Sequence, residues 1–222
     1  MDGFEKIDFE NWDRREIFEK YENYVFGPSV NLDITELYRY MKACGRKFYP
    51  LFCWAVTKLV NSDRDFRIVK IDGQLGYMDR LHSCYTLRRD AQPTLFIHMV
   101  TEYDDNLDVY YERFLLDQKT AQAENRLYYY GEMRFDSVDI SIVPDVSFTG
   151  LTLGMPPAFY KKDENNIRYT PFITVGRFYK KDGRVILPAG TAFHHEVNDG
   201  YHAGKYINGL QQVLNSFADF PR

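Results

Sequence analysis

The sequence contains few cysteines, and their arrangement excludes a fold built on disulfides. Only 3 of its 222 residues are cysteines, at Cys44, Cys53 and Cys84, and no two of them form a CxxC pair. An odd and sparse set of this kind indicates reduced thiols in a cytoplasmic protein. None of the three has an obvious base nearby, so we do not expect a cysteine nucleophile.

Other markers of common protein classes are also missing. The chain has no run of like charges, no glycine-rich phosphate loop and no segment as long as an apolar membrane span. The N-terminal stretch MDGFEKIDFENWDRRE lacks the apolar core of a signal peptide. A formal net charge of −4 argues against a nucleic-acid binder, which normally has a basic surface. We therefore predict a cytoplasmic protein without a nucleic-acid or membrane partner.

Aromatic residues, in contrast, are abundant. They make up 17% of the chain, with 18 tyrosines and 17 phenylalanines. Such numbers indicate deep pockets or a broad subunit interface, although many of these rings also belong in a core. At 222 residues the chain is long enough to bury one full core, and no repeat, low-complexity segment or linker divides it. We predict a single domain over residues 1–222.

Helical and strand patterns are interspersed along the chain. We expect helices over residues 11–24, 34–43, 47–62 and 106–125, and another that begins after Gly200. In the helix over 106–125, Val109, Phe114 and Leu116 are predicted to face the core. We expect strands over residues 67–71, 74–79, 83–87, 94–100, 138–143, 147–153, 170–181 and 184–193. Hairpin turns are expected at Asp72-Gly73 and Asp182-Gly183. The pattern predicts an α/β two-layer sandwich, with a mixed β-sheet covered by helices.

The most informative stretch is RVILPAGTAFHHEVNDGYHAGKYINGL, which begins at Arg184. Its apolar run ends on His194 and His195, and Asp199 and Gly200 follow before the pattern becomes that of a helix. Because successive side chains of a strand point to opposite faces, only one of the two histidines can face a given cleft. Structural histidines and an N-capping aspartate are the common role for such residues. The pattern HH-x-x-x-DG is more specific, and it resembles the active-site motif of the chloramphenicol acetyltransferase family.

That motif also occurs in related coenzyme-A-dependent acyltransferases and in peptide-synthetase condensation domains, so the rest of the chain must decide. The stretches NWDRREIFEKY, LDITEL, RKFYPL, PDVSFTG and TPFITVGRFY follow the order and spacing of type A chloramphenicol acetyltransferases. Together they span nearly the whole chain, which is identified as a member of that family. The resemblance implies acetyl-CoA as co-substrate, a small-molecule acceptor, and a homotrimer with the acceptor pocket at the subunit interface.

The resemblance also implies roles for individual residues. His195 matches the general base that takes a proton from the acceptor hydroxyl, a role that suits an imidazole at neutral pH. Asp199 matches a structural aspartate that forms an ion pair with an arginine, here Arg14. The expected coenzyme-A contacts are Lys47, Tyr49, Arg177 and Phe178. The expected acceptor contacts are Tyr21, Thr86 and Thr174, and Phe148 and Tyr128–Tyr130 are further aromatic candidates for that pocket. The tyrosine run is equally compatible with a strand that faces a neighbouring subunit.

The chain departs from the family at the turn PDVSFTG, where the family's last residue is a serine that donates to the oxyanion. Here this residue is Gly150, and the loss of one such donor generally costs about 10²–10³-fold in rate. Either Thr149 or Ser147 swings in, a water or backbone N–H replaces the donor, or the protein is slow. The acceptor is therefore open: chloramphenicol, another small hydroxylated compound, or a ligand that is bound without turnover.

Five potential metal ligands also lie close together, at His194, His195, Glu196, Asp199 and His202. The run HEVND is a near miss to the zinc-protease motif HExxH, which needs both ligands on one helical turn. Here the first histidine lies at a strand end and Gly200 interrupts the stretch. We therefore expect no metal site.

Overall fold

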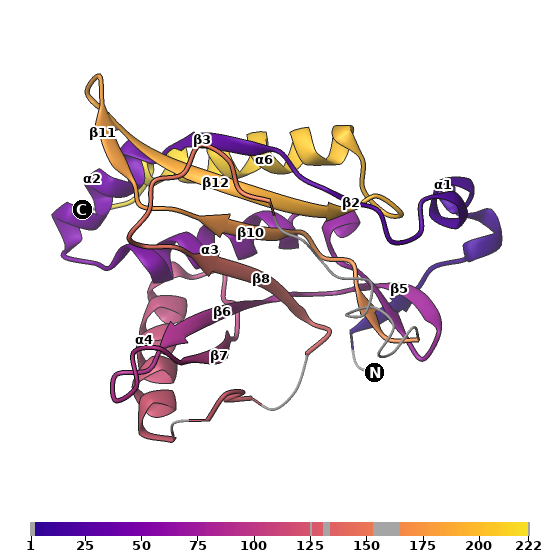
Figure 1. The fold of residues 1–222 in the computed structure, drawn as a ribbon, viewed down its shortest axis with the longest axis horizontal. Helices are drawn as coiled ribbons and strands as arrows, with labels where there is room; N and C mark the ends of the chain where they lie inside the picture. Colours follow the sequence, from indigo (N-terminus) through magenta and orange to yellow (C-terminus); the bar gives the residue numbers. More distant parts are fainter. Residues whose placement is uncertain (1–2, 125, 131–133, 153–164, 222) are drawn as a thin grey trace.

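The computed structural model describes residues 3–124, 126–130, 134–152 and 165–221. In these residues the chain forms two β-sheets and a layer of helices (Figure 1). The helices are α1 (Arg15–Lys20), α2 (Thr35–Cys44), α3 (Phe48–Asn61), α4 (Leu107–Glu124) and α6 (Gly200–Asn215), with 3₁₀ turns at Phe9–Asn11, Arg64–Phe66 and Ser216–Asp219. The larger sheet holds β2 (Val25–Phe26), β3 (Ser29–Asp33), β6 (His82–Arg88), β7 (Phe96–Thr101), β8 (Ser137–Ile142), β10 (Phe172–Val175), β11 (Tyr179–Lys181) and β12 (Arg184–His194). The smaller sheet holds β1 (Phe4–Lys6), β4 (Ile68–Ile71), β5 (Gln74–Met78) and β9 (Ile167–Arg168).

Strand β12 is the organising element of the larger sheet. It pairs with β10 and β11 along one side and with β2 and β3 along the other. Beyond β10 the order continues through β8 and β6 to β7. Strand β8 runs parallel to both β6 and β10, whereas the other pairs of this sheet are antiparallel. The sheet is mixed, and the predicted α/β fold is confirmed.

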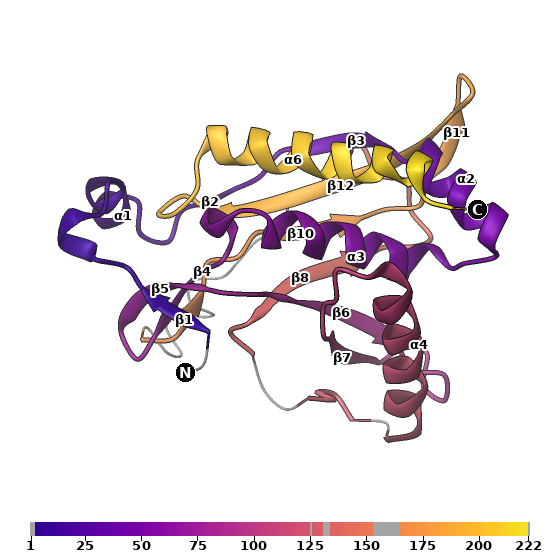
Figure 2. The same ribbon diagram turned by 180° about the vertical axis from the view of Figure 1, so that it is seen from behind.

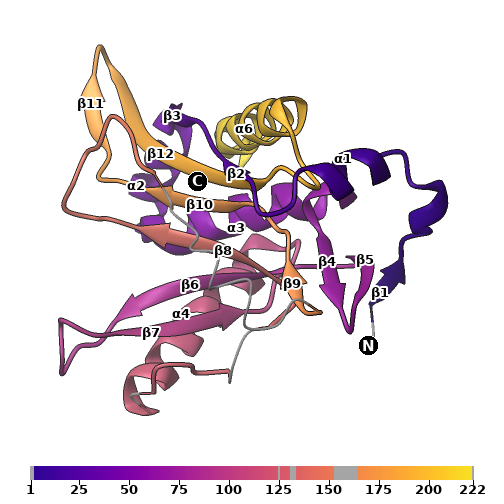
Figure 3. The ribbon, with the colours of Figure 1, turned by 45° about the vertical axis from the view of Figure 1, so that its right-hand side comes forward.

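Helices α2, α3, α4 and α6 cover one face of this sheet, as the view from behind shows (Figure 2). The layering is also visible from the side, where α6 and α3 lie against β12 and β10 (Figure 3). Alternate residues of β12 face the helices, and Leu187 and Phe193 are fully buried there. The Phe193 ring packs edge-on against Tyr206 of α6 at 5.4 Å between centroids. Helix α3 is buried nearly all round, as its continuous apolar pattern predicted.

Both predicted hairpin turns are present. Asp72 and Gly73 have φ of 49° and 76°, and Asp182 and Gly183 have φ of 48° and 75°. Two consecutive residues with positive φ form the two-residue turn whose twist matches that of antiparallel strands. The Asp-Gly pairs therefore set the registers of β4 with β5 and of β11 with β12.

Three predictions about secondary structure are wrong. The helix expected over residues 11–24 is helical only over Arg15–Lys20, because the chain turns at Asn23, where φ is 65°. No strand forms over residues 147–152, and residue 153 lies outside the described residues. The strand expected over 170–181 is broken between β10 and β11. There Gly176 lets the chain at Val146 approach so closely that a Cβ would lie 2.6 Å from the Val146 carbonyl oxygen.

The core face of α4 also differs from the prediction. Phe114 is fully buried, but Val109 and Leu116 are exposed. Tyr110 occupies an inward position instead, with its hydroxyl hydrogen-bonded to Ser83 in the core at 2.7 Å. Because this tyrosine satisfies its hydroxyl inside the protein, the helix turns aromatic residues inward and leaves Val109 and Leu116 in solvent.

Candidate active site

The two histidines separate at the end of β12. His194 is the last residue of the strand and is buried, with its ring edge-on to Tyr169 at 5.2 Å. Burial, with a contribution from Arg168, lowers the pKa of His194 to about 4, so this imidazole stays neutral near pH 7. The backbone N–H groups of Val197 and Asn198 both donate to the His194 carbonyl oxygen, at 3.2 and 2.8 Å. The chain therefore turns sharply at His195, as the motif predicted.

His195 lies in an aromatic slot. Its ring stacks on Tyr21 with centroids 4.5 Å apart and planes 13° apart, and Phe26 lies 5.2 Å away. The His195 backbone N–H donates to the Tyr24 carbonyl oxygen at 2.8 Å. Within the described part of the chain, the buried Nδ1 atom of His195 has no hydrogen-bond partner. Stacking rather than hydrogen bonding thus fixes the plane of this imidazole.

Asp199 joins the two ends of the chain. Arg14 Nη1 lies 3.0 Å from Asp199 Oδ2, so the ion pair implied by the family resemblance is present. The other oxygen, Oδ1, caps α6 by accepting from the Tyr201 and His202 backbone N–H groups at 3.0 and 3.4 Å. Burial raises the pKa of Asp199, but hydrogen bonds from His202 and Arg14 outweigh it and hold this pKa well below its usual range. The carboxylate is therefore ionised at any neutral pH.

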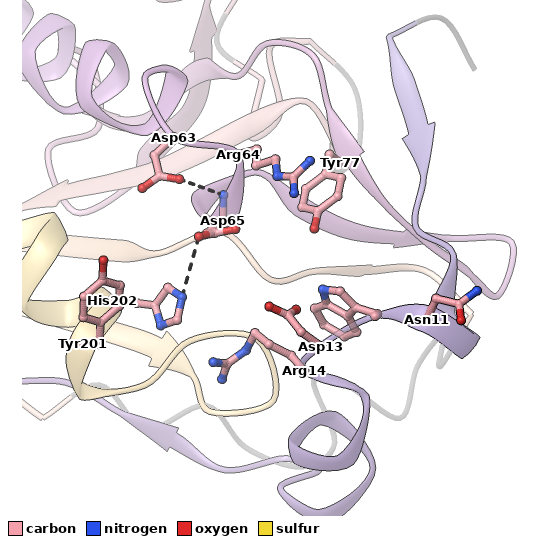
Figure 4. A pocket seen from close by; sticks show the side chains of 10 residues that line it. Asn11, Asp13, Arg14, Asp63, Arg64, Asp65, Tyr77, Tyr201 and His202 are labelled. Atoms are coloured by element: carbon pink, nitrogen blue, oxygen red, sulfur yellow. Dashed lines mark hydrogen bonds and ion pairs between the residues drawn. The ribbon is translucent and has the colours of Figure 1, made fainter.

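A cavity of about 580 Å³ lies beside this ion pair (Figure 4). Arg14 and His202 form part of its wall, and the His202 Nε2 atom lies 3.7 Å from Asp65 Oδ2. Asp63 also lines the cavity, and its carboxylate forms an ion pair with Lys205 at 2.5 Å. His195 does not line this cavity. The cavity therefore borders the charged residues around the Arg14–Asp199 ion pair and does not border the imidazole of His195.

Comparisons with known proteins bear on this arrangement. A family model described as chloramphenicol acetyltransferase matches residues 2–211. A chloramphenicol acetyltransferase of Staphylococcus aureus is 36% identical over 215 residues, which are 95% of this chain and 95% of that protein. Another, of Clostridium perfringens, is 32% identical over 220 residues and 96% of each chain. The chain belongs to the chloramphenicol acetyltransferase family.

Solved structures agree on the fold. A chloramphenicol acetyltransferase superimposes with a TM-score of 0.75 at 19% identity and covers 95% of this chain and 99% of its own. The dihydrolipoamide acetyltransferase of Azotobacter vinelandii superimposes with a TM-score of 0.64 at 17% identity, over 91% of this chain and 85% of its own. The predicted family is confirmed, and with it the predicted class of enzyme, an acetyl-CoA-dependent acetyltransferase.

Three of the four expected coenzyme-A contacts lie near one another. Phe178 packs against Phe48 at 5.6 Å, so the segment of Arg177 and Phe178 neighbours the start of α3, which Lys47 precedes. Both Lys47 and Arg177 are exposed. They place positive charge beside the N-terminus of α3, where the helix dipole also favours an anion.

Tyr49, the fourth expected contact, is partly buried and packs against the core. Its hydroxyl donates to the Ile140 carbonyl oxygen at 3.1 Å, and its ring packs edge-on against Tyr85 and Phe114. Burial raises the pKa of Tyr49 well above its usual range. The hydroxyl of Tyr49 is therefore engaged with the backbone of β8.

The segment over residues 146–151, which is expected to contact the oxyanion, lies at the surface and is held by hydrogen bonds to Ser29 and Arg177. The Arg177 backbone N–H donates to the Val146 carbonyl oxygen at 2.7 Å, and the Leu151 N–H donates to Ser29 Oγ at 3.1 Å. Between them Ser147 Oγ donates to the Arg177 carbonyl oxygen at 2.6 Å. A Cβ at Gly150 would meet nothing within 4 Å, and Thr149 is exposed. The segment therefore has room for a side chain at Gly150, while the Ser147 hydroxyl is already engaged.

The expected acceptor contacts are divided between two places. Tyr21 contacts His195 directly. Thr86 and Thr174 lie on the face of the sheet opposite the helices, because their strand neighbours Leu87 and Ile173 face the core. Thr174 is buried, and its Oγ1 atom has no hydrogen-bond partner in the described part of the chain. Phe148, the remaining expected contact, packs against Gly176 beside this face.

The tyrosine run packs on its own chain. Tyr128 stacks on His98 of β7 with centroids 5.0 Å apart, and Tyr130 donates a hydrogen bond to Asp117 at 3.0 Å. Tyr128 nevertheless stays about half exposed. Both hypotheses for this run, an aromatic pocket and a contact with a neighbouring subunit, remain open.

Sequence reasoning missed two residues around the imidazole, Tyr24 and Phe26, and considered Glu196 only as a potential metal ligand. Tyr24 and Phe26 lie in a short segment whose contact with β12 is visible only in three dimensions. Glu196 had a signal in the motif itself, a charged residue directly after the histidine pair in HHEVNDG.

No helix in the described part of the chain is both long and apolar enough to cross a membrane. No group of three or more histidine, cysteine, aspartate or glutamate side chains in that part is placed to hold a metal ion.

Proposed function

We propose that this protein transfers the acetyl group of acetyl-CoA to a hydroxyl of chloramphenicol, with His195 as general base and residues 1–222 as one acyltransferase domain. The observation that carries the proposal is the imidazole of His195, held in an aromatic slot at the turn that follows β12. The relatives named above as chloramphenicol acetyltransferases support the choice of acceptor. The same imidazole would serve any small hydroxylated acceptor that reaches it.

In the proposed reaction His195 takes the proton of the acceptor hydroxyl while that oxygen attacks the acetyl carbonyl of the thioester. The tetrahedral intermediate collapses with cleavage of the C–S bond, and the thiolate of coenzyme A recovers the proton from the imidazolium. A base of this kind contributes about 10²–10⁴-fold in rate. Asp199 and Arg14 form an ion pair that supports the turn in which His195 lies, and they take no proton in the proposed reaction.

Lys47, Arg177 and Phe178 are proposed to bind the phosphates and the adenine of coenzyme A. Two exposed cations beside an aromatic ring suit that combination of charge and π-face, and the N-terminus of α3 adds its dipole. For the oxyanion, Thr149 is the nearest hydroxyl in sequence to Gly150, since Ser147 already donates to a backbone oxygen. We assign Thr149, or a backbone N–H of the same segment, to this part.

We also propose that the active enzyme is a homotrimer. The face of the larger sheet opposite helices α2, α3, α4 and α6 carries Thr86 and Thr174, which are expected to contact the acceptor, while Tyr21 and His195 lie at the strand end. A second subunit packed on that face would bring its own His195 opposite these threonines. Light scattering tests the trimer. Restoration of activity on mixing a His195→Ala variant with a Thr174→Trp variant tests the shared site.

The function is tested by release of coenzyme-A thiol with chloramphenicol and a panel of alcohols. His195→Ala should lower the rate by at least about 10²-fold without changing the circular dichroism spectrum. Release that persists in this variant would refute the assignment of the base. If no acceptor supports release although coenzyme A binds, the second candidate function stands: an acyltransferase fold that binds without turnover, which the empty space at Gly150 favours.

A further inference from the structure

The residue after the proposed base, Glu196, is a buried carboxyl group in the turn at the end of β12. Its side chain is 6% exposed, although a glutamate is among the residue types least often buried. Its Oε1 atom accepts a hydrogen bond from the backbone N–H of Asn23 at 3.2 Å. This contact joins the turn that carries His195 to a segment 173 residues earlier in the chain.

The segment that Glu196 holds is a second tight turn. The Tyr24 N–H donates to the Tyr21 carbonyl oxygen at 3.3 Å, and Asn23 has a φ of 65°. Few residues other than glycine adopt this left-handed conformation, and asparagine tolerates it better than most. Such a turn needs contacts that hold it, and Glu196 supplies one at its central N–H.

Both ends of this turn contact His195. Tyr21 stacks on the imidazole at 4.5 Å, and the Tyr24 carbonyl oxygen accepts the His195 N–H at 2.8 Å. The turn over residues 21–24 is thus one wall of the slot, and Glu196 ties this wall to the residue next to the imidazole. We propose that Glu196 is a positioning residue for His195: its carboxyl holds the 21–24 turn, and thereby the Tyr21 ring, where that ring fixes the imidazole.

The surroundings of Glu196 make this contact sensitive to protons. A cavity of about 620 Å³ reaches the carboxyl and gives a proton a path to it. The other titratable groups on its wall are Glu19 of α1, Glu22 of the turn, Lys70 of β4 and Tyr169 after β9. Burial raises the pKa of Glu196 to about 7, against the hydrogen bond from Asn23 and the charge of Lys70.

Protonation weakens the contact that positions the turn. The bond from Asn23 to an ionised carboxylate is assisted by charge, and this assistance disappears when the carboxyl takes up a proton. The hold on the 21–24 turn should therefore loosen as the pH falls from 8 towards 6. The proposal rests on the proposed function of His195, so its test needs a readout that does not depend on activity.

Three variants provide the test: Glu196→Ala, Glu196→Gln and the matched control Glu22→Gln. Glu22 lies in the same turn and lines the same cavity, but it is not the acceptor of the Asn23 N–H. The first readout is the NMR signal of the His195 Cε1 proton, which the ring current of the stacked Tyr21 shifts upfield. In Glu196→Ala this signal should move downfield, towards the position of an unstacked histidine. In Glu22→Gln it should not move.

The second readout is kinetic. In Glu196→Ala kcat should fall by about 10²-fold, because displacement of a catalytic group by about 1 Å has that effect, while KM for acetyl-CoA stays unchanged. Glu196→Gln keeps an acceptor oxygen for Asn23 but lacks its charge, so its kcat at pH 8 should lie between those of the wild type and Glu196→Ala. Between pH 8 and 6 the wild type should lose more activity than Glu196→Gln, whose amide does not titrate.

An unshifted His195 proton in Glu196→Ala would overturn the positioning role, whether or not the wild type transfers acetyl groups. A shifted proton in a protein that releases no thiol with any acceptor would keep the positioning role and refute the proposed function instead. If Glu196→Ala does not fold, Glu196→Gln decides. A pH profile identical to that of the wild type would then overturn the proposal.

Discussion

Replacement of Asp199 by alanine tests the contact that joins the two ends of the chain. The substitution removes the cap of α6, which typically contributes about 1 kcal/mol. It also breaks the ion pair with Arg14, whose side chain is 13% exposed against 32% for Asp199. Exposed pairs contribute up to about 1 kcal/mol, and breaking a buried pair costs about 3–5 kcal/mol. An intermediate value of about 2 kcal/mol suits this pair, so Asp199→Ala should lower the free energy of unfolding by about 3 kcal/mol.

A double-mutant cycle isolates the ion pair from the cap. Arg14→Ala leaves the cap in place and should cost about 2 kcal/mol, and the double variant should cost less than the two single variants together by about 1–2 kcal/mol. The measurement is unfolding in urea at 25 °C and at one protein concentration, because assembly adds a concentration-dependent contribution. Arg15→Ala is the matched control, since its pairs with Glu10 and Glu19 are exposed and should contribute less than about 0.5 kcal/mol.

The dependence on pH gives a second check of the same contact. The pKa of Asp199 is held well below its ordinary value of about 3.9, so its carboxylate contributes stability that is present above that pH. This stability is lost as the pH falls through the folded-state pKa. The difference between the wild type and Asp199→Asn should therefore be constant near pH 7 and shrink below pH about 4. If the double variant loses the sum of the free energies lost by Arg14→Ala and Asp199→Ala, to within about 0.5 kcal/mol, the two residues do not stabilise each other and the reasoning is refuted.

Three further predictions follow from single sites. Gly150→Ser should fold normally, because the space there is open, and should raise the acetyl-transfer rate if a missing oxyanion donor limits it; an unchanged rate in the thiol assay would show that another group serves the oxyanion. Iodoacetamide should modify the exposed Cys44 in the native protein before Cys53 and Cys84, since burial raises the pKa of both latter thiols, and mass spectrometry would contradict this if all three reacted at one rate. The raised pKa of Glu196 gives stability at acid pH that is lost as the pH rises through about 7. Glu196→Gln should therefore gain up to about 3 kcal/mol over the wild type at pH 8 and much less at pH 5, and an equal gain at both would disprove the shift.

Local rules predicted much of the fold. The two Asp-Gly turns specify their hairpins through φ values that few other residues adopt, and Gly45 ends α2 with a φ of 66°. The strand–turn–helix course of the histidine motif was visible in the change of period after Gly200. These features depend on neighbours in the sequence, and so the sequence alone predicts them.

Features that depend on distant partners were not predictable in the same way. The segment Phe4–Lys6 has one aromatic and two charged residues and no strand pattern, yet it becomes β1 because β5 offers an edge. Tyr49 matched a cofactor contact by position, and no local pattern indicates the hydrogen bond that its hydroxyl donates to the Ile140 carbonyl oxygen. The contact of Glu196 with Asn23 spans 173 residues, which no local pattern reveals.

The ion pair between Arg14 and Asp199 also has a consequence for synthesis on the ribosome. Its partners are 185 positions apart, so Arg14 leaves the exit tunnel long before its carboxylate exists. At about 5–20 residues per second the delay is about 10–40 s. Throughout that interval the nascent chain also lacks β12, with which β2 and β3 must pair. A prematurely terminated translation product therefore exposes unpaired strand edges instead of retaining partial activity.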